Sequence, residues 1–333
     1  MHNEFAVEVK NLYVEFKTDY GVVKAVNGLD ISIAPGKTLG LVGETGAGKT
    51  TTGLAMMNLI PSPPGRIVQG EIRICGQDIL KLSEREMDKL RGQQISMIFQ
   101  DPMTSLNPVM TVGTQIAEVI AYHEKVNKTE AMKKAKEILE LVGIPAERAK
   151  EYPHQFSGGM KQRVIIAMAL VCNPSILIAD EPTTALDVTI QAQVLAMMKE
   201  LKEKLHTALL MITHDLGIVA DICDFVSVIY AGRIVEHGTL EDIFDNPAHP
   251  YTKGLFNSLP SITNRKTNLK PIRGLMPDPS NLPSGCPFHD RCDDACDICT
   301  SAMPQKAELS ESHYVECHLF HSDKDKSVFG GTK

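Results

Sequence analysis

A glycine-rich loop near the N-terminus constrains the fold of this 333-residue chain more than any other feature. Residues 43–50 read Gly-Glu-Thr-Gly-Ala-Gly-Lys-Thr and match the pattern G-x-x-x-x-G-K-[ST]. The apolar run 38–42 precedes the loop directly, and a helix-like stretch, 49–59, follows it. Glycines let backbone N–H groups turn inward around phosphate oxygens, and the start of the helix adds its positive dipole end. The sequence therefore predicts a nucleotide-phosphate site between a strand and a helix.

The loop and a second motif assign roles to particular residues. Lys49 is expected to reach the β- and γ-phosphates, and the Thr50 hydroxyl to bind Mg²⁺. The apolar strand 176–179 ends in Asp180 and Glu181. We expect Asp180 to hold Mg²⁺, directly or through water, and Glu181 to polarise the attacking water. The predicted nucleotide-binding residues are thus Gly43, Glu44, Thr45, Gly46, Ala47, Gly48, Lys49, Thr50, Thr51 and Asp180.

Strand-like and helix-like patterns alternate through residues 1–240, which is typical of an α/β domain. The predicted strands are 7–14, 28–33, 38–42, 176–179 and 208–213. The segment from about 103 to 155 is more helical and more charged, and it predicts an inserted helical lobe. Within it, the helix 130–141 places Met132, Ala135, Ile138 and Leu141 at three-residue steps, expected to share one face.

Residues 241–333 differ in character, because prolines crowd in and the periodic apolar pattern fades. Five of the eight cysteines lie between residues 286 and 317, namely Cys286, Cys292, Cys296, Cys299 and Cys317. In a reducing compartment such a cluster indicates metal ligation before disulfides. We therefore predict a small, irregular C-terminal domain stapled by a metal.

Charge and hydropathy exclude several classes of protein. The net charge of −7 argues against nucleic acid as the main partner, because phosphate binding needs a basic face. The longest apolar run, 164–172, is far shorter than the ~20 residues of a membrane-spanning helix. The N-terminus has no apolar stretch typical of a secretory signal, so we expect a cytosolic chain.

Residues 156–163, Phe-Ser-Gly-Gly-Met-Lys-Gln-Arg, resemble the signature motif of the ATP-binding-cassette (ABC) ATPases, which usually reads LSGGQ-x-QR. Phe replaces Leu and Met replaces Gln in this chain. The resemblance implies that Ser157, Gly158 and Gly159 form a second anion site, which closes on the γ-phosphate bound by another subunit. One chain would then hold half of each of two sites, and the active form would be a dimer.

Three further residues match that family, and all the motifs occur in the family's order. Gln100 matches the glutamine that contacts Mg²⁺ and water, and Asp187 matches a residue that contacts the opposite subunit's phosphate loop. His214 matches the switch histidine at the γ-phosphate. The resemblance implies an ABC-type P-loop NTPase fold with a mixed sheet, and an ATPase whose catalytic residues are Lys49, Gln100, Glu181 and His214.

The resemblance also implies an aromatic residue that stacks on adenine. Alignment of residues 11–16 with the family favours Phe16 for this contact. Tyr13 and Tyr20 remain alternatives.

Two stretches, 101–108 and 246–255, resemble the peptide-importer branch of the family, and the second contains His249-Pro250-Tyr251. This implies the ATP-hydrolysing subunit of a bacterial dipeptide or oligopeptide importer, peripheral on the cytoplasmic face of the membrane and soluble when isolated. The implied partners are a second ATPase subunit, homologous or identical, two membrane permease subunits docking on the helical lobe, and an extracytoplasmic peptide-binding protein, with no nucleic acid. A nickel importer, and a soluble ABC ATPase acting on nucleic acid, are the alternatives.

The spacing of Cys286, Cys292, Cys299 and Cys317 resembles the C-terminal extension of peptide-importer ATPases, where it is associated with a four-iron four-sulfur (4Fe-4S) cluster. Four thiolates on irregular loops can equally ligate Zn²⁺, so zinc is the alternative. Cys296 keeps a rival ligand set open.

Overall fold

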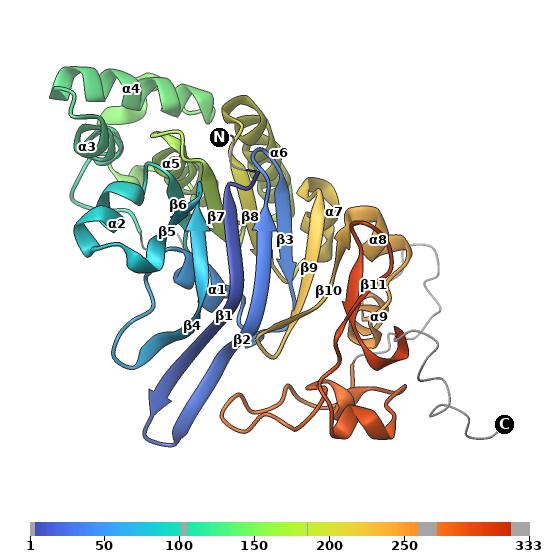
Figure 1. Cartoon of the computed structure of the whole chain (residues 1–333). Helices are drawn as coiled ribbons and strands as arrows, with labels where there is room; N and C mark the ends of the chain where they lie inside the picture. The colour runs from blue at the N-terminus through green and yellow to red at the C-terminus, as the bar shows by residue number, and fades with distance from the viewer. Residues whose placement is uncertain (1–3, 101–104, 185, 259–271, 321–333) are drawn as a thin grey trace.

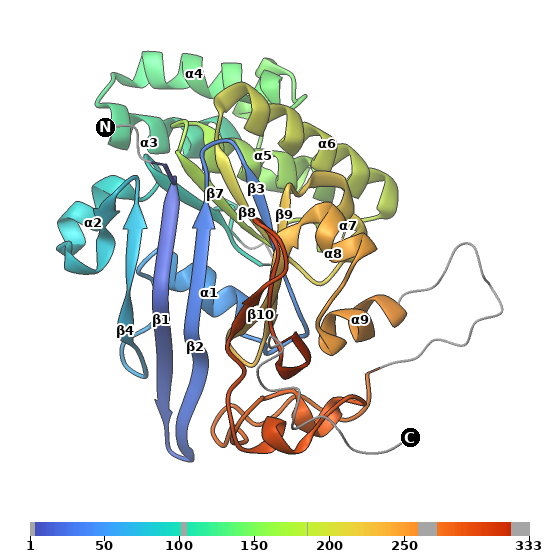
Figure 2. The same ribbon diagram turned by 45° about the vertical axis from the view of Figure 1, so that its right-hand side comes forward.

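An eight-stranded mixed sheet forms the centre of the molecule, in the strand order β11-β12-β10-β9-β3-β8-β7-β6. The structure is a computed structural model that describes residues 4–100, 105–184, 186–258 and 272–320. A second sheet, antiparallel and four-stranded, has the order β2-β1-β4-β5. Figures 1 and 2 show this second sheet on one side of the central sheet, with helices α5, α6 and α7 on the other side and α3 and α4 packed against α5.

Parallel pairing brings the predicted motifs to one edge of the central sheet. The five parallel strands are β3 (Thr38–Val42), β6 (Ile95–Ile98), β7 (Ile176–Asp180), β8 (Ala208–Thr213) and β9 (Phe225–Tyr230). The glycine-rich loop follows β3, Glu181 follows β7 and His214 follows β8. Carboxyl ends of neighbouring parallel strands meet at the same edge, so these residues converge there. The predicted strands at 38–42, 176–179 and 208–213 are confirmed.

The side chains of the parallel strands alternate between two cores. Leu209 and Met211 belong to the core shared with the helices, whereas Leu210 and Ile212 belong to the core under the antiparallel sheet. That sheet consists of β1 (Val7–Thr18), β2 (Gly21–Ile33), β4 (Gly65–Ile74) and β5 (Gln77–Asp78). The predicted strands 7–14 and 28–33 are confirmed, but both continue into a long hairpin.

Nine α-helices surround the sheets in the described residues. They are α1 (Lys49–Met56), α2 (Glu84–Leu90), α3 (Val112–Glu124), α4 (Lys128–Leu141), α5 (Gly158–Leu170), α6 (Val188–Leu205), α7 (Leu216–Ile222), α8 (Leu240–Asp245) and α9 (Pro250–Asn257). None of the helices in these described ranges has the length and apolarity needed to cross a bilayer.

The predicted helix at 130–141 is confirmed as α4, but the predicted buried face is wrong. The buried side chains are Ala131, Ala135, Ile138 and Leu139, while Leu141 is half exposed. A three-residue step turns 300° around an α-helix, so four residues at such steps drift through half a turn. The buried set follows steps of three and four instead.

The C-terminal region extends the central sheet. Strand β10 (Arg233–Thr239) pairs antiparallel with β9 and with β12 (Tyr314–Glu316), which in turn pairs with β11 (Lys306–Glu308). Cys286, Phe288 and Cys299 join the helix-side core. The predicted metal-stapled domain is therefore not supported, because sheet pairing and apolar packing attach this region to the rest of the chain. The irregular character is confirmed between 272 and 305, where only short 3₁₀ turns occur.

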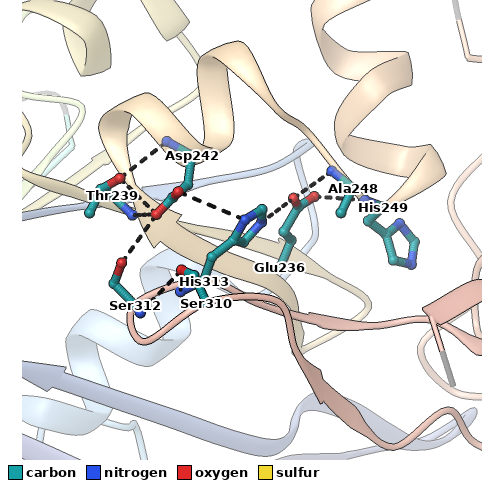
Figure 3. A network of polar contacts seen from close by, with 8 residues as sticks. All are labelled: Glu236, Thr239, Asp242, Ala248, His249, Ser310, Ser312 and His313. Atoms are coloured by element: carbon teal, nitrogen blue, oxygen red, sulfur yellow. Dashed lines mark hydrogen bonds and ion pairs between the residues drawn. The ribbon is translucent and has the colours of Figure 1, made fainter. Parts of the chain in front are cut away.

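A buried carboxylate reinforces this attachment (Figure 3). Glu236 on β10 is fully buried and accepts hydrogen bonds from Ala248 N at 2.7 Å, His249 N at 2.9 Å and His313 Nε2 at 2.9 Å. His249 then caps α9, because its Nδ1 accepts from Tyr251 N at 3.0 Å. Pro250 at the first helical position costs no hydrogen bond, because an N–H at that position would have no partner within the helix.

Candidate active site

The glycine-rich loop lies against the backbone of two strands. A Cβ atom on Gly43 would lie 2.3 Å from the carbonyl oxygen of Ile229 on β9, and one on Gly48 would lie 2.4 Å from that of Ala25 on β2. Gly48 also adopts a left-handed φ of 103° as it caps α1. Only glycine fits either position, so the pattern seen in the sequence has a steric cause here.

The side chain of Lys49 folds back into the glycine-rich loop. Its Nζ donates to the carbonyl oxygens of Gly43 at 2.7 Å and Glu44 at 3.0 Å. Burial lowers the pKa of Lys49, and the carboxylates of Glu181, Asp180 and Glu44 partly oppose this shift. The ammonium group is thus held where the loop would wrap a phosphate.

Asp180 is a buried carboxylate without hydrogen-bond partners among the described residues. The residue is 1% exposed, and neither carboxylate oxygen completes a hydrogen bond within the described part of the chain. Burial raises the pKa of Asp180, and the nearby Thr50 hydroxyl and the charge of Lys49 only partly oppose this. A buried acceptor without a donor is costly unless an ion or water meets it.

Glu181 is surrounded by hydrogen-bond partners. Its Oε1 lies 2.8 Å from His214 Nδ1, and its Oε2 accepts from Thr184 Oγ1 at 3.1 Å and from Gln100 Nε2 at 3.4 Å. Burial raises the pKa of Glu181, but hydrogen bonds from His214 and Thr184 and the charges of His214 and Lys49 outweigh it, so the net pKa is lowered. The side chain is a carboxylate at neutral pH.

Lys49, Gln100, Glu181 and His214 face one cavity of about 500 Å³. It is lined by Phe16, Val23, Ala25, Thr45, Gly46, Gly48, Lys49, Thr50, Thr51, Gln100, Glu181, His214 and Pro279. Gly43, Glu44, Ala47 and Asp180 do not line it, although the first three belong to the loop and Asp180 lies next to Glu181. Of the three aromatic candidates, Phe16 is in the lining, whereas Tyr13 is not and Tyr20 is 99% exposed.

The residues predicted to act on another subunit lie outside this cavity. Ser157 is exposed and caps α5, and Asp187 is exposed and caps α6 by accepting from Ile190 N at 3.0 Å. Gly158 begins α5, and a Cβ on Gly159 would lie 2.4 Å from Ile190 Cγ2. The structure therefore places all four at the beginnings of two packed helices, with Ser157 and Asp187 exposed and the two glycines half-buried. Ala185, next to this segment, lies outside the described residues.

Four of the five clustered cysteines line one small cavity, namely Cys286, Cys292, Cys299 and Cys317. The fifth, Cys296, has its Sγ 3.3 Å from that of Cys299. Burial raises the pKa of Cys292 to about 11 and of Cys317 to about 12, so both are thiols at neutral pH. Within the described ranges no three His, Cys, Asp or Glu side chains are arranged to hold a metal ion. The predicted metal centre is not supported by this geometry.

Three residues of the C-terminal region reach the site, and the sequence indicates none of these contacts. Pro279 lines the cavity, and its carbonyl oxygen accepts from Lys24 N at 2.8 Å. Arg291 and Tyr251 both contact Glu44 of the loop. More than 200 residues separate these partners from the loop, so no local pattern could indicate them.

Two family models match the chain. One, described as "ABC transporter", covers residues 26–184, and another, described as "Oligopeptide/dipeptide transporter, C-terminal region", covers residues 235–299. Among solved structures, a dimeric ABC transporter cassette, MJ0796, has a TM-score of 0.63 and 26% identity and covers 70% of this chain and 98% of its own. The ABC transporter component cbiO1 from Clostridium perfringens has a TM-score of 0.64 and 27% identity, with 73% and 92% covered.

Curated relatives match almost the whole chain. The oligopeptide transport ATP-binding protein OppD of Bacillus subtilis is 52% identical over 96% of this chain and 90% of its own length. The dipeptide transport ATP-binding protein DppD of the same organism is 48% identical over 98% of each. With such identity over such coverage, the chain belongs to the ABC transporter ATPases, in the group that carries the oligopeptide/dipeptide transporter C-terminal region.

Proposed function

We propose that this ATPase energises the import of dipeptides or oligopeptides. The observation that carries the ATP-hydrolysing part of this proposal is the 2.8 Å contact between Glu181 and His214 on the wall of the cavity that also holds Lys49. This contact places Glu181, whose carboxylate can accept a proton, beside His214 at the predicted phosphate site. The names and the identity of the Bacillus subtilis relatives support peptides over nickel as the cargo.

In this proposal the cavity residues bind ATP and promote its hydrolysis. Lys49 and the loop N–H groups bind the β- and γ-phosphates, and Phe16 stacks on adenine. Glu181 accepts a proton from the attacking water, because its lowered pKa keeps it ionised. His214 and Gln100 orient that carboxylate through the hydrogen bonds described above.

The residues present fit a magnesium ion. Asp180 offers two carboxylate oxygens without hydrogen bonds beside the Thr50 hydroxyl, and oxygen ligands are those that Mg²⁺ prefers. Thr50, Gln100 and Asp180 would hold the ion. When bound, Mg²⁺ supplies charge neutralisation at the phosphates.

We propose further that the site is completed by a second ATPase subunit, identical or homologous. The exposed positions of Ser157 and Asp187 and the half-buried positions of Gly158 and Gly159, all outside their own cavity, support contacts to a nucleotide or loop on another chain. Helix α5 presents its N-terminal N–H groups there, which suits an anion.

The helical lobe, about 103–155, is our proposed contact with two membrane permeases. Several large apolar side chains are exposed in its described part, namely Val109, Tyr122, Leu141 and Tyr152. Exposed apolar side chains grouped on one lobe are typical of interaction surfaces. The chain would then lie peripherally on the cytoplasmic face of the membrane, serving an extracytoplasmic peptide-binding protein, with no role for nucleic acid.

We propose residues 1–240 as the nucleotide-binding part and 241–333 as an extension that can ligate a 4Fe-4S cluster, with zinc as the alternative. Cys286, Cys292, Cys299 and Cys317 line one cavity, and their side chains would have to rearrange to hold the cluster, because no three of the described residues are arranged as a metal site. Anaerobically purified chain should absorb broadly near 400 nm and contain iron, and Cys317→Ser should reduce both. Colourless protein with stoichiometric zinc, or with neither metal, would contradict the iron assignment.

The transport function is tested by uptake in cells that carry the chain as Lys49→Ala. Uptake of a labelled dipeptide or oligopeptide should be lost, because the phosphates lose their lysine, while nickel uptake is unchanged. Lys89→Ala, on an exposed position of α2, is the matched control and should transport normally. Loss of nickel uptake with intact peptide uptake would reassign the cargo, and co-purification with nucleic acid instead of permeases would overturn the transport role.

A further inference from the structure

We propose that the C-terminal extension is part of the nucleotide site, and that Arg291 is a positioning residue that sets the phosphate-binding loop through Glu44. The inference deepens the ATPase function and rests on it. It concerns the contact between two segments that lie 247 residues apart in the sequence.

Every polar group of Glu44 is engaged. Its carboxylate accepts from both terminal nitrogens of Arg291, at 2.6 Å and 3.0 Å. Its backbone N–H donates to the Tyr251 hydroxyl at 2.9 Å. Its carbonyl oxygen accepts from Lys49 Nζ at 3.0 Å. Two side chains of the extension and the phosphate-binding lysine therefore hold the same residue.

Arg291 has the surroundings of a built contact and not of a surface ion pair. Its side chain is only 5% exposed. Its Nε donates to the carbonyl oxygen of Arg273 at 2.8 Å, and one terminal nitrogen also reaches the Tyr230 hydroxyl at 3.3 Å. The Glu44 side chain is 30% exposed, but bidentate guanidinium–carboxylate bonds are directional, so the fork from the buried Arg291 fixes the orientation of Glu44.

Aromatic packing makes the support of this contact rigid. Tyr230 on β9 packs edge-on against Tyr251 and Phe288, with ring centroids 4.6 Å and 5.2 Å away. Tyr230 and Tyr251 are fully buried. Tyr230 of the sheet, Tyr251 of α9 and Phe288 of the cysteine-rich segment thus form one aromatic cluster next to the contact with Glu44.

Charge gives Arg291 a second effect. The carboxylate of Glu44 is close enough to Lys49 to raise its pKa. Without Arg291, an uncompensated negative charge would stand beside a site for phosphates and compete with them for the lysine. Arg291 removes that competition while it holds the backbone in place.

The extension also touches the cavity itself. Pro279 lines it beside Val23 and Ala25, and is fixed to β2 through the hydrogen bond from Lys24 N. The described segment 272–291 therefore reaches the nucleotide site at two places, which makes a purely peripheral role for the extension inconsistent with the geometry.

The test compares variants of the full chain, with the ATP dissociation constant and steady-state ATPase kinetics as readouts. For Arg291→Met we expect the dissociation constant and KM for ATP to rise roughly tenfold or more, with kcat changed less than about threefold, because the contact holds the loop before and during the reaction. Arg291→Lys keeps the charge but loses the fork and should be intermediate. Tyr251→Phe should weaken binding by about three- to tenfold.

A double-mutant cycle separates positioning from general destabilisation. If Arg291 acts through Glu44, the variant Arg291→Met with Glu44→Gln binds ATP no more weakly than Arg291→Met alone. Arg273→Met is the matched control, because it removes a nearby arginine that is 85% exposed, and its ATP affinity should equal that of the unmodified chain. If Arg291→Met does not fold, Arg291→Lys carries the same comparison, with nucleotide-free thermal unfolding recorded for each.

Two failures are distinguishable. An unmodified chain that binds and hydrolyses ATP, with unchanged KM in folded Arg291→Met and Arg291→Lys, overturns the inference alone. Additive effects in the cycle do the same. An unmodified, assembled transporter without ATPase activity would instead overturn the proposed function.

Discussion

At the scale of single residues, Glu181 shows how one side chain is prepared for a reaction. It has a left-handed φ of 47°, which is uncommon outside glycine, and its backbone N–H donates to the carbonyl oxygen of Ile212 at 2.9 Å. A strained position at the end of a buried strand is typical of a functional site. The side chain is thereby turned toward His214 and the cavity.

Replacement of this carboxylate tests its proposed role. Glu181→Gln should reduce kcat for ATP by about a hundredfold or more, because the amide cannot accept a proton, while the ATP dissociation constant stays within about threefold. Single-turnover hydrolysis and equilibrium binding measure the two quantities. Glu200→Gln, on the exposed side of α6, is the control and should keep full activity. Near-normal turnover in Glu181→Gln would remove it from the mechanism.

At the scale of elements, the sequence predicted those parts whose cause is local. The steric demands on Gly43 and Gly48 are visible as a motif, and the strands that end at Val42, Asp180 and Thr213 are continuous apolar runs. The predicted buried face of α4 is wrong, because residues at three-residue steps do not stay on one face of a helix. The face that is buried depends on the partner helix, which the local sequence does not show.

Contacts that depend on distant pairing could not be predicted. Strand β12 has three residues, too few for an alternating pattern, and it exists because β10 offers a free edge. Arg291 carries no signal of its own, since its partner Glu44 lies in a different segment. Tyr251 belongs to a motif that the sequence analysis did single out, but its contact with the loop follows only from the position of α9.

The buried carboxylate of Glu236 makes a measurable contribution to the attachment of these elements. Glu236→Gln should lower the free energy of unfolding by ~1–3 kcal/mol, because an amide oxygen cannot accept all three hydrogen bonds and its NH₂ faces donors. Urea unfolding followed by circular dichroism gives the value. Glu8→Gln, which breaks an exposed pair with Lys10, should change it by less than ~0.5 kcal/mol. Equal effects of both changes would contradict the role of Glu236.

Two histidines with lowered pKa values, one half-buried and one buried, predict lower stability in acid. Burial lowers the pKa of His237 to about 4 and of His249 to about 3, below the ~6.5 of an unfolded chain. Between these values the unfolded state binds more protons, so the free energy of unfolding falls as the pH drops from about 7 toward 4. The loss approaches ~2.7 kcal/mol per pH unit where both histidines contribute fully.

Urea unfolding between pH 7 and pH 5 measures this slope. His249→Asn keeps a capping acceptor for α9 and removes one titration, so its slope should be about half. His206→Asn, at an exposed left-handed position, is the control and should keep the full slope. A slope that His249→Asn leaves unchanged would show that His249 does not contribute.

At the scale of the whole molecule, the proposed second site predicts association that depends on nucleotide. Glu181→Gln should form dimers with ATP and Mg²⁺ and remain monomeric without them, as measured by analytical ultracentrifugation. Ser157→Arg in the same background should prevent dimers, because it places bulk and charge at the beginning of α5. Dimers that form equally without ATP, or in spite of Ser157→Arg, would contradict this arrangement.

The ion pair between Glu44 and Arg291 also has a consequence for the order in which the chain becomes competent. A ribosome adding ~5–20 residues per second completes the loop roughly 10 to 50 s before it reaches residue 291. A nascent or interrupted chain therefore carries every nucleotide-binding motif while the loop still lacks its clamp. Full affinity for ATP would therefore arise only after Arg291 has been synthesised. The activity of this subunit would then depend on synthesis of its C-terminal extension.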